Sequence, residues 1–486
     1  MSKRPKTIQE YIDETPRWED GTEVSEAPMT RMQWRIWGLA TAGKFFEGLV
    51  VFMTGVALPL MGKEFHLTAA DNGMISAASL AGILIGATAL GGLADHFGRK
   101  MLFISEMVLF TIFLVLVAVS PSFPLLVLSL FGMGLALGCD YPTAHLVISE
   151  SIPSHCRGKL VLGAFGFQAV GALAGTVLGF FILSISKSLT DWRLMYACAI
   201  IPAIAVIIGR FFITQSPHWL MSKGRHKEAE REMRRLLERK PQYPKNIVLE
   251  PDVPLPLGAT KTPEFTKLFT KPKYRRATIL ASVPWFLQDL STYGIGIFTP
   301  TILAYTFGHE SSIPRNLAGI IHADIQAAKG AAIIDVLLIL GIVAAIFLAD
   351  KVGRIKLQVG GFIGCAAGLL LAAISTYFDG TAHVLMIFAG FMIFNFMTNM
   401  GPNAMTYLLA GEVFPTKVRG VGAGFAASFA KIGAVATAFL FPILLKDIGT
   451  APLLYILIGT CLLGAWVTHR FAIETKGVNL EHIKLD

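Results

Sequence analysis

Charged residues stand out inside the long apolar stretches of this chain. They are Lys44, Glu47, Asp140, Asp289, Asp335 and Lys431. A charge near the centre of a bilayer costs about 2.5–3.5 kcal/mol on insertion scales, so such residues usually face the inside of a helix bundle, where they pair or handle ions and protons. Their presence predicts a polar site enclosed by membrane-spanning helices. Asp335 matches no motif, and no role is predicted for it.

The clearest candidate for this site is a stripe formed by Trp285, Asp289 and Tyr293. The i, i+4, i+8 spacing places all three on one face of a helix. Aromatic residues at this spacing are more often core packing. The carboxylate between them instead favours a site that offers an acid, a hydroxyl donor and an apolar wall.

Two further positions could handle charge. Lys44 and Glu47 are spaced i, i+3, so they can meet and neutralise each other on one helix. Asp140 lies two residues before Pro142, where a helix loses a backbone hydrogen bond and can bend. Asp140 is therefore interpreted as a functional carboxylate, with a structural partnership to Lys44 as the alternative.

These residues must be positioned by membrane-spanning helices. The chain of 486 residues is 53% hydrophobic and only 15% charged, and each helix needs about 20 apolar residues to cross a bilayer. Twelve spans are predicted, at residues 36–60, 73–94, 101–119, 123–148, 160–184, 193–213, 277–305, 328–349, 358–376, 382–409, 419–445 and 451–471. The predicted fold is therefore an all-α membrane protein.

Two phrases recur at an offset of roughly half the chain. SESIPSHCRG (149–158) returns as GEVFPTKVRG (411–420), and GGLADHFGRK (91–100) returns as FLADKVGRIK (347–356). Such repeats predict a duplicated unit, here two pseudo-symmetric six-helix bundles, as in transporters that hold a solute between their halves. The predicted parts are a tail (1–34), a first bundle (35–214), a central loop with a charged surface helix (215–275), a second bundle (276–472) and a second tail (473–486).

The repeated phrases fall on loops at one side of the predicted bundle. Their acidic and basic residues can form ion pairs that are made when that side closes and broken when it opens. We therefore predict a gating role, with a fixed loop anchor as the alternative. The residues are Asp95, Arg99, Glu150, Arg157, Asp350, Arg354, Glu412 and Arg419.

The net charge of +9 could indicate nucleic-acid binding, but most Lys and Arg residues fall on one side of the predicted spans. This bias is the positive-inside pattern and predicts that both termini are cytoplasmic. The five cysteines have no paired spacing. No phosphate-binding loop, metal cluster or nucleophile arrangement occurs in the sequence, so we expect neither an enzyme nor a cofactor.

Taken together, these motifs resemble the major facilitator superfamily over residues 30–475. The phrases in both halves and SPHWL (216–220) carry the resemblance. Within it, the chain is most similar to the phosphate:proton symporters and related bacterial metabolite:proton symporters. The matching segments are GCDYP (138–142), FGFQAVG (165–171), WFLQDLSTYG (285–294), GPN (401–403) and FAKIGA (429–434).

The resemblance implies an anion site and a proton route. The residues implied around the anion are Tyr141, Gln168, Trp285, Asp289, Tyr293, Asn403 and Lys431. Glu47, Asp140 and Asp289 are implied in proton coupling. The pattern departs at Val50, where the family commonly has a second acidic residue, and at the added Lys44. The proton route and the solute can therefore differ from those of the family.

The expected function is proton-coupled transport of an anionic solute by alternating access, with inorganic phosphate favoured. A small organic anion or other metabolite is the alternative solute, and a sensor that transports nothing is a third possibility. The expected partners are the anion, protons and the lipid bilayer, with no nucleic acid. The protein is expected to be a monomer in the plasma membrane or the bacterial inner membrane.

The predicted orientation can be tested by labelling introduced cysteines from outside the cell. Thiols at Ser312 and Gly380, in predicted outer loops, should react with a membrane-impermeant reagent. A thiol at Lys227, in the central loop, should react only after the membrane is permeabilised. Outside labelling at Lys227 would reverse the predicted orientation.

Overall fold

Long helices make up almost all of the computed structural model. It describes residues 6–15, 26–90, 93–238, 247–249, 264–310, 317–414 and 418–476. Within these residues, eleven helical segments are long and apolar enough to cross a membrane. The long helix α12 lies outside this set, and its middle carries the polar residues Gln288, Asp289, Ser291 and Thr292. With α12 included, the number of spans is the predicted twelve.

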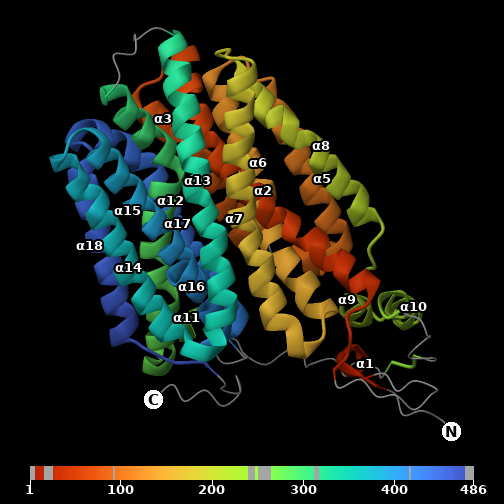
Figure 1. The fold of residues 1–486 in the computed structure, drawn as a ribbon. Coiled ribbons are helices and arrows are strands. Elements are labelled where there is room, and N and C mark those ends of the chain that lie inside the picture. Colours follow the sequence, from red (N-terminus) through yellow and green to blue (C-terminus); the bar gives the residue numbers. More distant parts are fainter. Residues whose placement is uncertain are drawn as a thin grey trace.

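The helices fall into two groups in chain order, drawn in warm and cool colours in Figure 1. The first group contains α2 (Arg31–Glu64), α3 (Ala69–Ile85), α5 (Arg99–Ala118), α6 (Phe123–Ser151), α7 (Ser154–Ile185) and α8 (Asp191–Phe211). The second contains α12 (Pro272–Glu310), α13 (Leu317–Val352), α14 (Arg354–Ile374), α15 (Gly380–Met400), α16 (Pro402–Glu412), α17 (Arg419–Ile448) and α18 (Thr450–Arg470). Together α15 and α16 form one span. The exact residue boundaries predicted for the two halves stay predictions.

Short helices gather at one end of the bundle, which we call the α10 end (Figure 1). They include α1 (Ile8–Asp13), α9 (Pro217–Ser222) and α10 (His226–Leu236). The charged segment that contains α10 was predicted to be a solvated surface helix, and α10 is helical. However, α10 buries Ala229, Met233 and Leu236 against the first half. The packing is possible because these three residues lie on one face of the helix.

The repeated phrases form the same backbone turn in both halves. Gly98 precedes α5 with φ 91°, and Gly353 precedes α14 with φ 104°. Positive φ is accessible to glycine at little cost. Each turn also receives the same kind of cap, because Gln215 accepts from the Lys100 N–H at 3.0 Å and Glu474 accepts from the Arg354 N–H at 3.0 Å. The duplication read from the sequence is therefore present in the structure.

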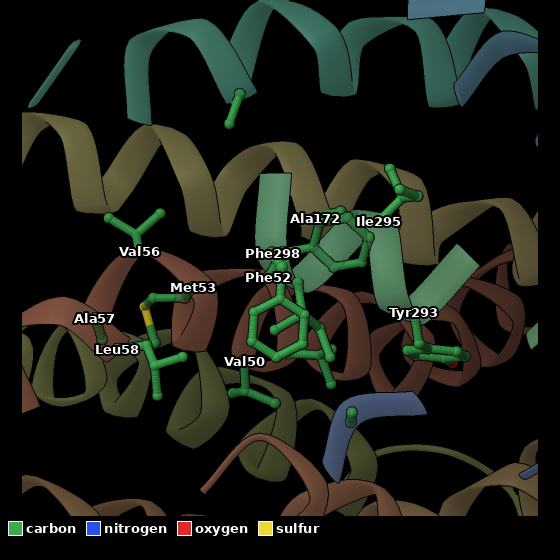
Figure 2. Close-up of a cluster of buried hydrophobic side chains, with 14 of the residues drawn as sticks. Val50, Phe52, Met53, Val56, Ala57, Leu58, Ala172, Tyr293, Ile295 and Phe298 are labelled. Carbon is green, nitrogen blue, oxygen red and sulfur yellow. The ribbon is translucent and has the colours of Figure 1, made fainter. Parts of the chain in front are cut away.

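Glycine lets α2 and α7 approach closely near the middle of the first half. A Cβ on Gly171 would lie 1.9 Å from the Phe45 carbonyl oxygen, and one on Gly48 would lie 2.0 Å from the Gln168 carbonyl oxygen. An apolar cluster extends from this crossing toward α12. Figure 2 shows Phe52 of α2 and Phe298 of α12 within the cluster, with Tyr293 at its edge. The crossing therefore positions the polar residues of both helices beside one another.

Replacing Gly171 with alanine should lower the thermal unfolding temperature, because the methyl group overlaps the α2 backbone. Overpacking of this kind typically costs about 1–3 kcal/mol. Gly163→Ala on the same helix is the matched control, because its Cβ would meet only the Trp37 ring, at 3.5 Å. Equal melting temperatures for both variants in detergent would show that α2 and α7 are not in tight contact.

Candidate functional site

Four charged side chains from three helices meet inside the bundle. Lys44 donates to Glu47 Oε2 at 2.5 Å on α2. Lys431 of α17 lies 3.2 Å from Glu47 Oε1 and 3.5 Å from Asp289 Oδ2 of α12. Glu47 and Asp289 are buried, and the lysine side chains are only 13% exposed. The predicted contact between Lys44 and Glu47 is therefore present, within a larger charge cluster.

Tyr293 is the centre of the hydrogen bonds around this cluster. Its hydroxyl donates to Glu47 Oε1 at 2.8 Å and accepts from Lys431 Nζ at 2.6 Å and from Gln168 Nε2 at 2.9 Å. Glu47 and Gln168 come from the first half, whereas Tyr293 and Lys431 come from the second. The polar site therefore lies between the two halves.

Most of the residues predicted around the anion line one cavity at this cluster. The cavity is lined by Lys44 and Phe165 and by six of the predicted residues: Gln168, Trp285, Asp289, Tyr293, Asn403 and Lys431. Asn403 bonds to Asn399 Oδ1 at 2.6 Å, so its amide is held by a neighbour on the preceding turn. The side chain of Tyr141 lies outside the described residues. The stripe of Trp285, Asp289 and Tyr293 thus faces the cavity as its spacing predicted.

Aromatic rings close the cavity toward the α10 end. Phe165 of α7 stacks on Tyr407 of α16, with ring centroids 4.5 Å apart and 18° between the planes. Tyr407 also meets the Trp285 ring edge-on at 6.2 Å. A second cavity beyond this stack is lined by Glu47, Asp140, His145 and Tyr407. The Phe165–Tyr407 stack therefore lies between the two cavities, and Lys44 and Glu47 of the charge cluster border the second cavity as well.

The halves also touch at the opposite end of the bundle. A Cβ on Gly55 of α2 would lie 2.1 Å from the Ile297 carbonyl oxygen of α12, and one on Gly73 of α3 would lie 2.3 Å from the Phe439 carbonyl oxygen of α17. Backbones this close leave no passage between those pairs of helices. The charge cluster is consequently enclosed between two sets of contacts that both join the halves.

The predicted gating residues form ion pairs within each half. Arg99 lies 3.1 Å from Glu150 in the first half, and Arg354 lies 3.2 Å from Glu412 and 2.8 Å from Asp350 in the second. The same carboxylates also bond to hydroxyls, Glu150 to Ser216 and Glu412 to Thr475. These pairs fasten loops within a half, and the gating role stays a prediction.

Of the three other predicted gating residues, only Arg157 has a described side chain. Arg157 donates to Gln9 Oε1 at 2.9 Å and to the Ile152 carbonyl oxygen at 3.2 Å. It therefore ties the start of α7 to α1. The side chains of Asp95 and Arg419 lie outside the described residues.

The family model for sugar (and other) transporters matches residues 37–486. The chain belongs to this transporter family. This membership confirms the resemblance to the major facilitator superfamily. The family model, the relatives and the similar solved structures are all of transporters. The protein is thus a multi-pass membrane transporter.

Known relatives cover nearly the whole transporter. The inner membrane metabolite transport protein YgcS from Escherichia coli is 28% identical over 94% of this chain and 95% of its own. A Schizosaccharomyces pombe protein, provisionally named an inorganic phosphate transporter, is 26% identical over 94% of this chain and 88% of its own.

Solved structures confirm the fold of the transporter. The xylose transporter XylE from Escherichia coli, in a partially occluded inward open conformation, matches with a TM-score of 0.75 at 21% identity. The match covers 93% of this chain and 100% of that one. The all-α fold of two six-helix bundles is therefore confirmed.

The transporter also contains a second buried charge cluster, around Arg210, which is not among the predicted site residues. Arg210 of α8 lies 2.6 Å from Asp140 Oδ1 and 3.2 Å from Glu106 Oε1. All three side chains are nearly inaccessible, and the guanidinium lies 3.4 Å from the Phe103 ring centroid. Asp140 is thus paired with Arg210, and the alternative of a partnership with Lys44 is not what the structure shows.

A signal for this second cluster was present in the sequence. Glu106 and Arg210 both lie within predicted spans. Because a charge in the membrane is costly, this position identifies them as candidate functional residues, as it does Asp140. Asp140 also lines the cavity shared with Glu47. The cluster therefore borders the site, and its role in proton coupling stays a prediction.

Replacing Arg210 with alanine should be strongly destabilising, because it leaves two buried carboxyl groups without their cation. Breaking a buried ion pair costs about 3–5 kcal/mol. Arg225→Ala is the control, because Arg225 pairs with Glu228 at a site where both side chains are well exposed, and such pairs contribute about 0–1 kcal/mol. The check is the thermal unfolding temperature of the purified protein. Similar losses for both variants would contradict the importance of the Arg210 cluster.

Proposed function

We propose that this transporter moves a small anion together with protons across the membrane by alternating access. The charge cluster of Lys44, Glu47, Asp289 and Lys431 carries this proposal. With all four groups ionised, the two lysines and two carboxylates balance. A proton on one carboxylate leaves one positive charge in excess, and an anion restores the balance.

Asp289 is the carboxyl group that we assign to the proton. Glu47 contacts both lysines and Tyr293. Among the described residues, Asp289 forms an ion pair with Lys431 only, at 3.5 Å from Oδ2. An anion bound at Lys431 would lie beside Asp289 and repel its negative charge. Protonation of Asp289 removes this repulsion and frees Lys431 for the anion. Proton and anion binding therefore favour each other.

Inorganic phosphate is the first candidate for the solute. Phosphate needs several hydrogen-bond donors and a cation, and the cavity offers Lys431, the Gln168 amide, the Tyr293 hydroxyl and the Trp285 indole. The provisional name of the Schizosaccharomyces pombe relative agrees with this choice.

A small organic anion is the second candidate, favoured by the aromatic wall of the cavity. Phe165, Trp285 and Tyr407 form continuous ring contacts beside the charge cluster. Such a wall suits an apolar body attached to a carboxylate, whereas phosphate has no apolar surface to bury. The name of YgcS, a metabolite transport protein, is compatible with this alternative.

The orientation, oligomeric state and gating that we propose are those predicted from the sequence. We propose that the α10 end faces the cytoplasm with both termini, that the protein works as a monomer in the cell membrane, and that the loop ion pairs support gating. The Lys and Arg bias along the chain supports this orientation.

Variants at the cluster test the anion–proton mechanism. Lys431→Ala should weaken anion binding by about 2–5 kcal/mol, because one partner of a buried charge pair is lost. Asp289→Asn resembles the protonated acid, so it should keep binding and lose accumulation driven by a proton gradient. Lys329→Ala, an exposed lysine on α13, is the control and should behave as wild type.

The measurements are solute binding and uptake into proteoliposomes with and without a proton gradient. Labelled phosphate and a labelled aromatic monocarboxylate should be compared in the same preparation, since the preferred solute identifies the class. Proton-driven accumulation by Asp289→Asn, or unchanged binding by Lys431→Ala, would contradict the mechanism.

A further inference from the structure

Asp335 is a buried carboxyl group between the two halves that the charge cluster does not use. It lies within α13 and is 3% exposed. Its Oδ2 atom is 2.7 Å from the hydroxyl of Thr176, which belongs to α7 of the first half. Its Oδ1 atom is 3.5 Å from the amide nitrogen of Asn395 on α15. A single side chain thus joins α13 to a helix of the opposite half.

The contacts of the Thr176 hydroxyl favour a proton on Asp335. A threonine hydroxyl has one hydrogen to donate, and the Thr176 hydroxyl lies 3.0 Å from the Ala172 carbonyl oxygen as well as 2.7 Å from Asp335. A protonated Asp335 satisfies both contacts, because its O–H donates to Thr176 while Thr176 donates to Ala172. Asn395 then donates to the remaining carboxyl oxygen.

The charges around Asp335 agree with a neutral acid. On α7, residues 163–185 contain no titratable side chain. The neighbouring helices carry titratable side chains at other positions, among them Lys44 and Glu47 of α2, Asp289 and Tyr293 of α12, His383 of α15, and His322, Asp324 and Lys329 of α13 itself. Among the described residues, the hydrogen-bond partners of Asp335 are Thr176 and Asn395, and no cation forms an ion pair with it. An ionised carboxylate buried without a cation would be very costly.

We propose that Asp335 is a proton-binding site that latches α7 to α13. In the conformation described here the carboxyl group is protonated and holds the two halves together through Thr176. Loss of the proton places a negative charge in an apolar interface, so it favours conformations in which the helices separate and water reaches Asp335. This latch does not depend on the identity of the solute or on the charge cluster.

Infrared spectroscopy of the purified full-length protein tests the protonation directly. The wild-type-minus-Asp335→Asn difference spectrum at neutral pH should contain the carbonyl band of a protonated carboxyl group. Thr176→Val should move this band to higher frequency, because the acid loses its acceptor, and Thr176→Ser should leave it in place. A difference spectrum with carboxylate bands alone, or a band that ignores Thr176→Val, would overturn the proposal.

A distance measurement tests the latch. Spin labels at Lys187, just after α7, and Lys329 of α13 occupy exposed positions on opposite halves. Wild-type protein in nanodiscs should shift toward longer distances as the pH becomes alkaline, whereas Asp335→Asn should keep the short distances. Asp324→Asn, which neutralises another buried carboxyl group of α13, should shift as wild type does. An equal shift in wild type and Asp335→Asn would show that Asp335 does not hold the halves together.

Discussion

The need to neutralise two lysines inside an apolar bundle is the constraint on which the interior depends. Lys44 and Lys431 cannot be left without counter-charges away from water, and Glu47 and Asp289 supply them at 2.5–3.5 Å. These four residues come from α2, α12 and α17, so the ion pairs join helices of both halves. The contacts that neutralise the buried lysines are therefore the same contacts that hold the two halves together around the cavity.

Local spacing predicted the parts of this site that lie on one helix. The stripe on α12 and the pair of Lys44 and Glu47 depend only on helical periodicity, so the sequence sufficed for both. The partner of Asp140 could not be found in this way, because Arg210 is 70 residues away along the chain. Which helix faces Asp140 depends on the packing and rotation of α5, α6 and α8, which no local pattern records.

Local sequence patterns also could not predict where the helices begin and end or which aromatic rings stack. The helix α13 begins at Leu317, well before the apolar stretch predicted from residue 328, because a helix can continue past the segment that matches a membrane. The stack of Phe165 on Tyr407 joins two residues that are ordinary members of apolar stretches in the sequence. Their pairing follows only from how the two halves are placed against each other.

The capped turns before α5 and α14 show how the duplication is built. Gln215 and Glu474, which follow the sixth and twelfth spans, each accept from a backbone N–H at the start of the third span of their own half. Ser216 and Thr475, the residues next to them, donate to Glu150 and Glu412 at the end of the fourth span of the same half. The two pairs differ in residue type and keep only their hydrogen-bonding roles. Each half therefore carries its own fastening, and a cut of the chain between residues 238 and 264 would remove none of these hydrogen bonds, because every one of them joins residues on the same side of the cut.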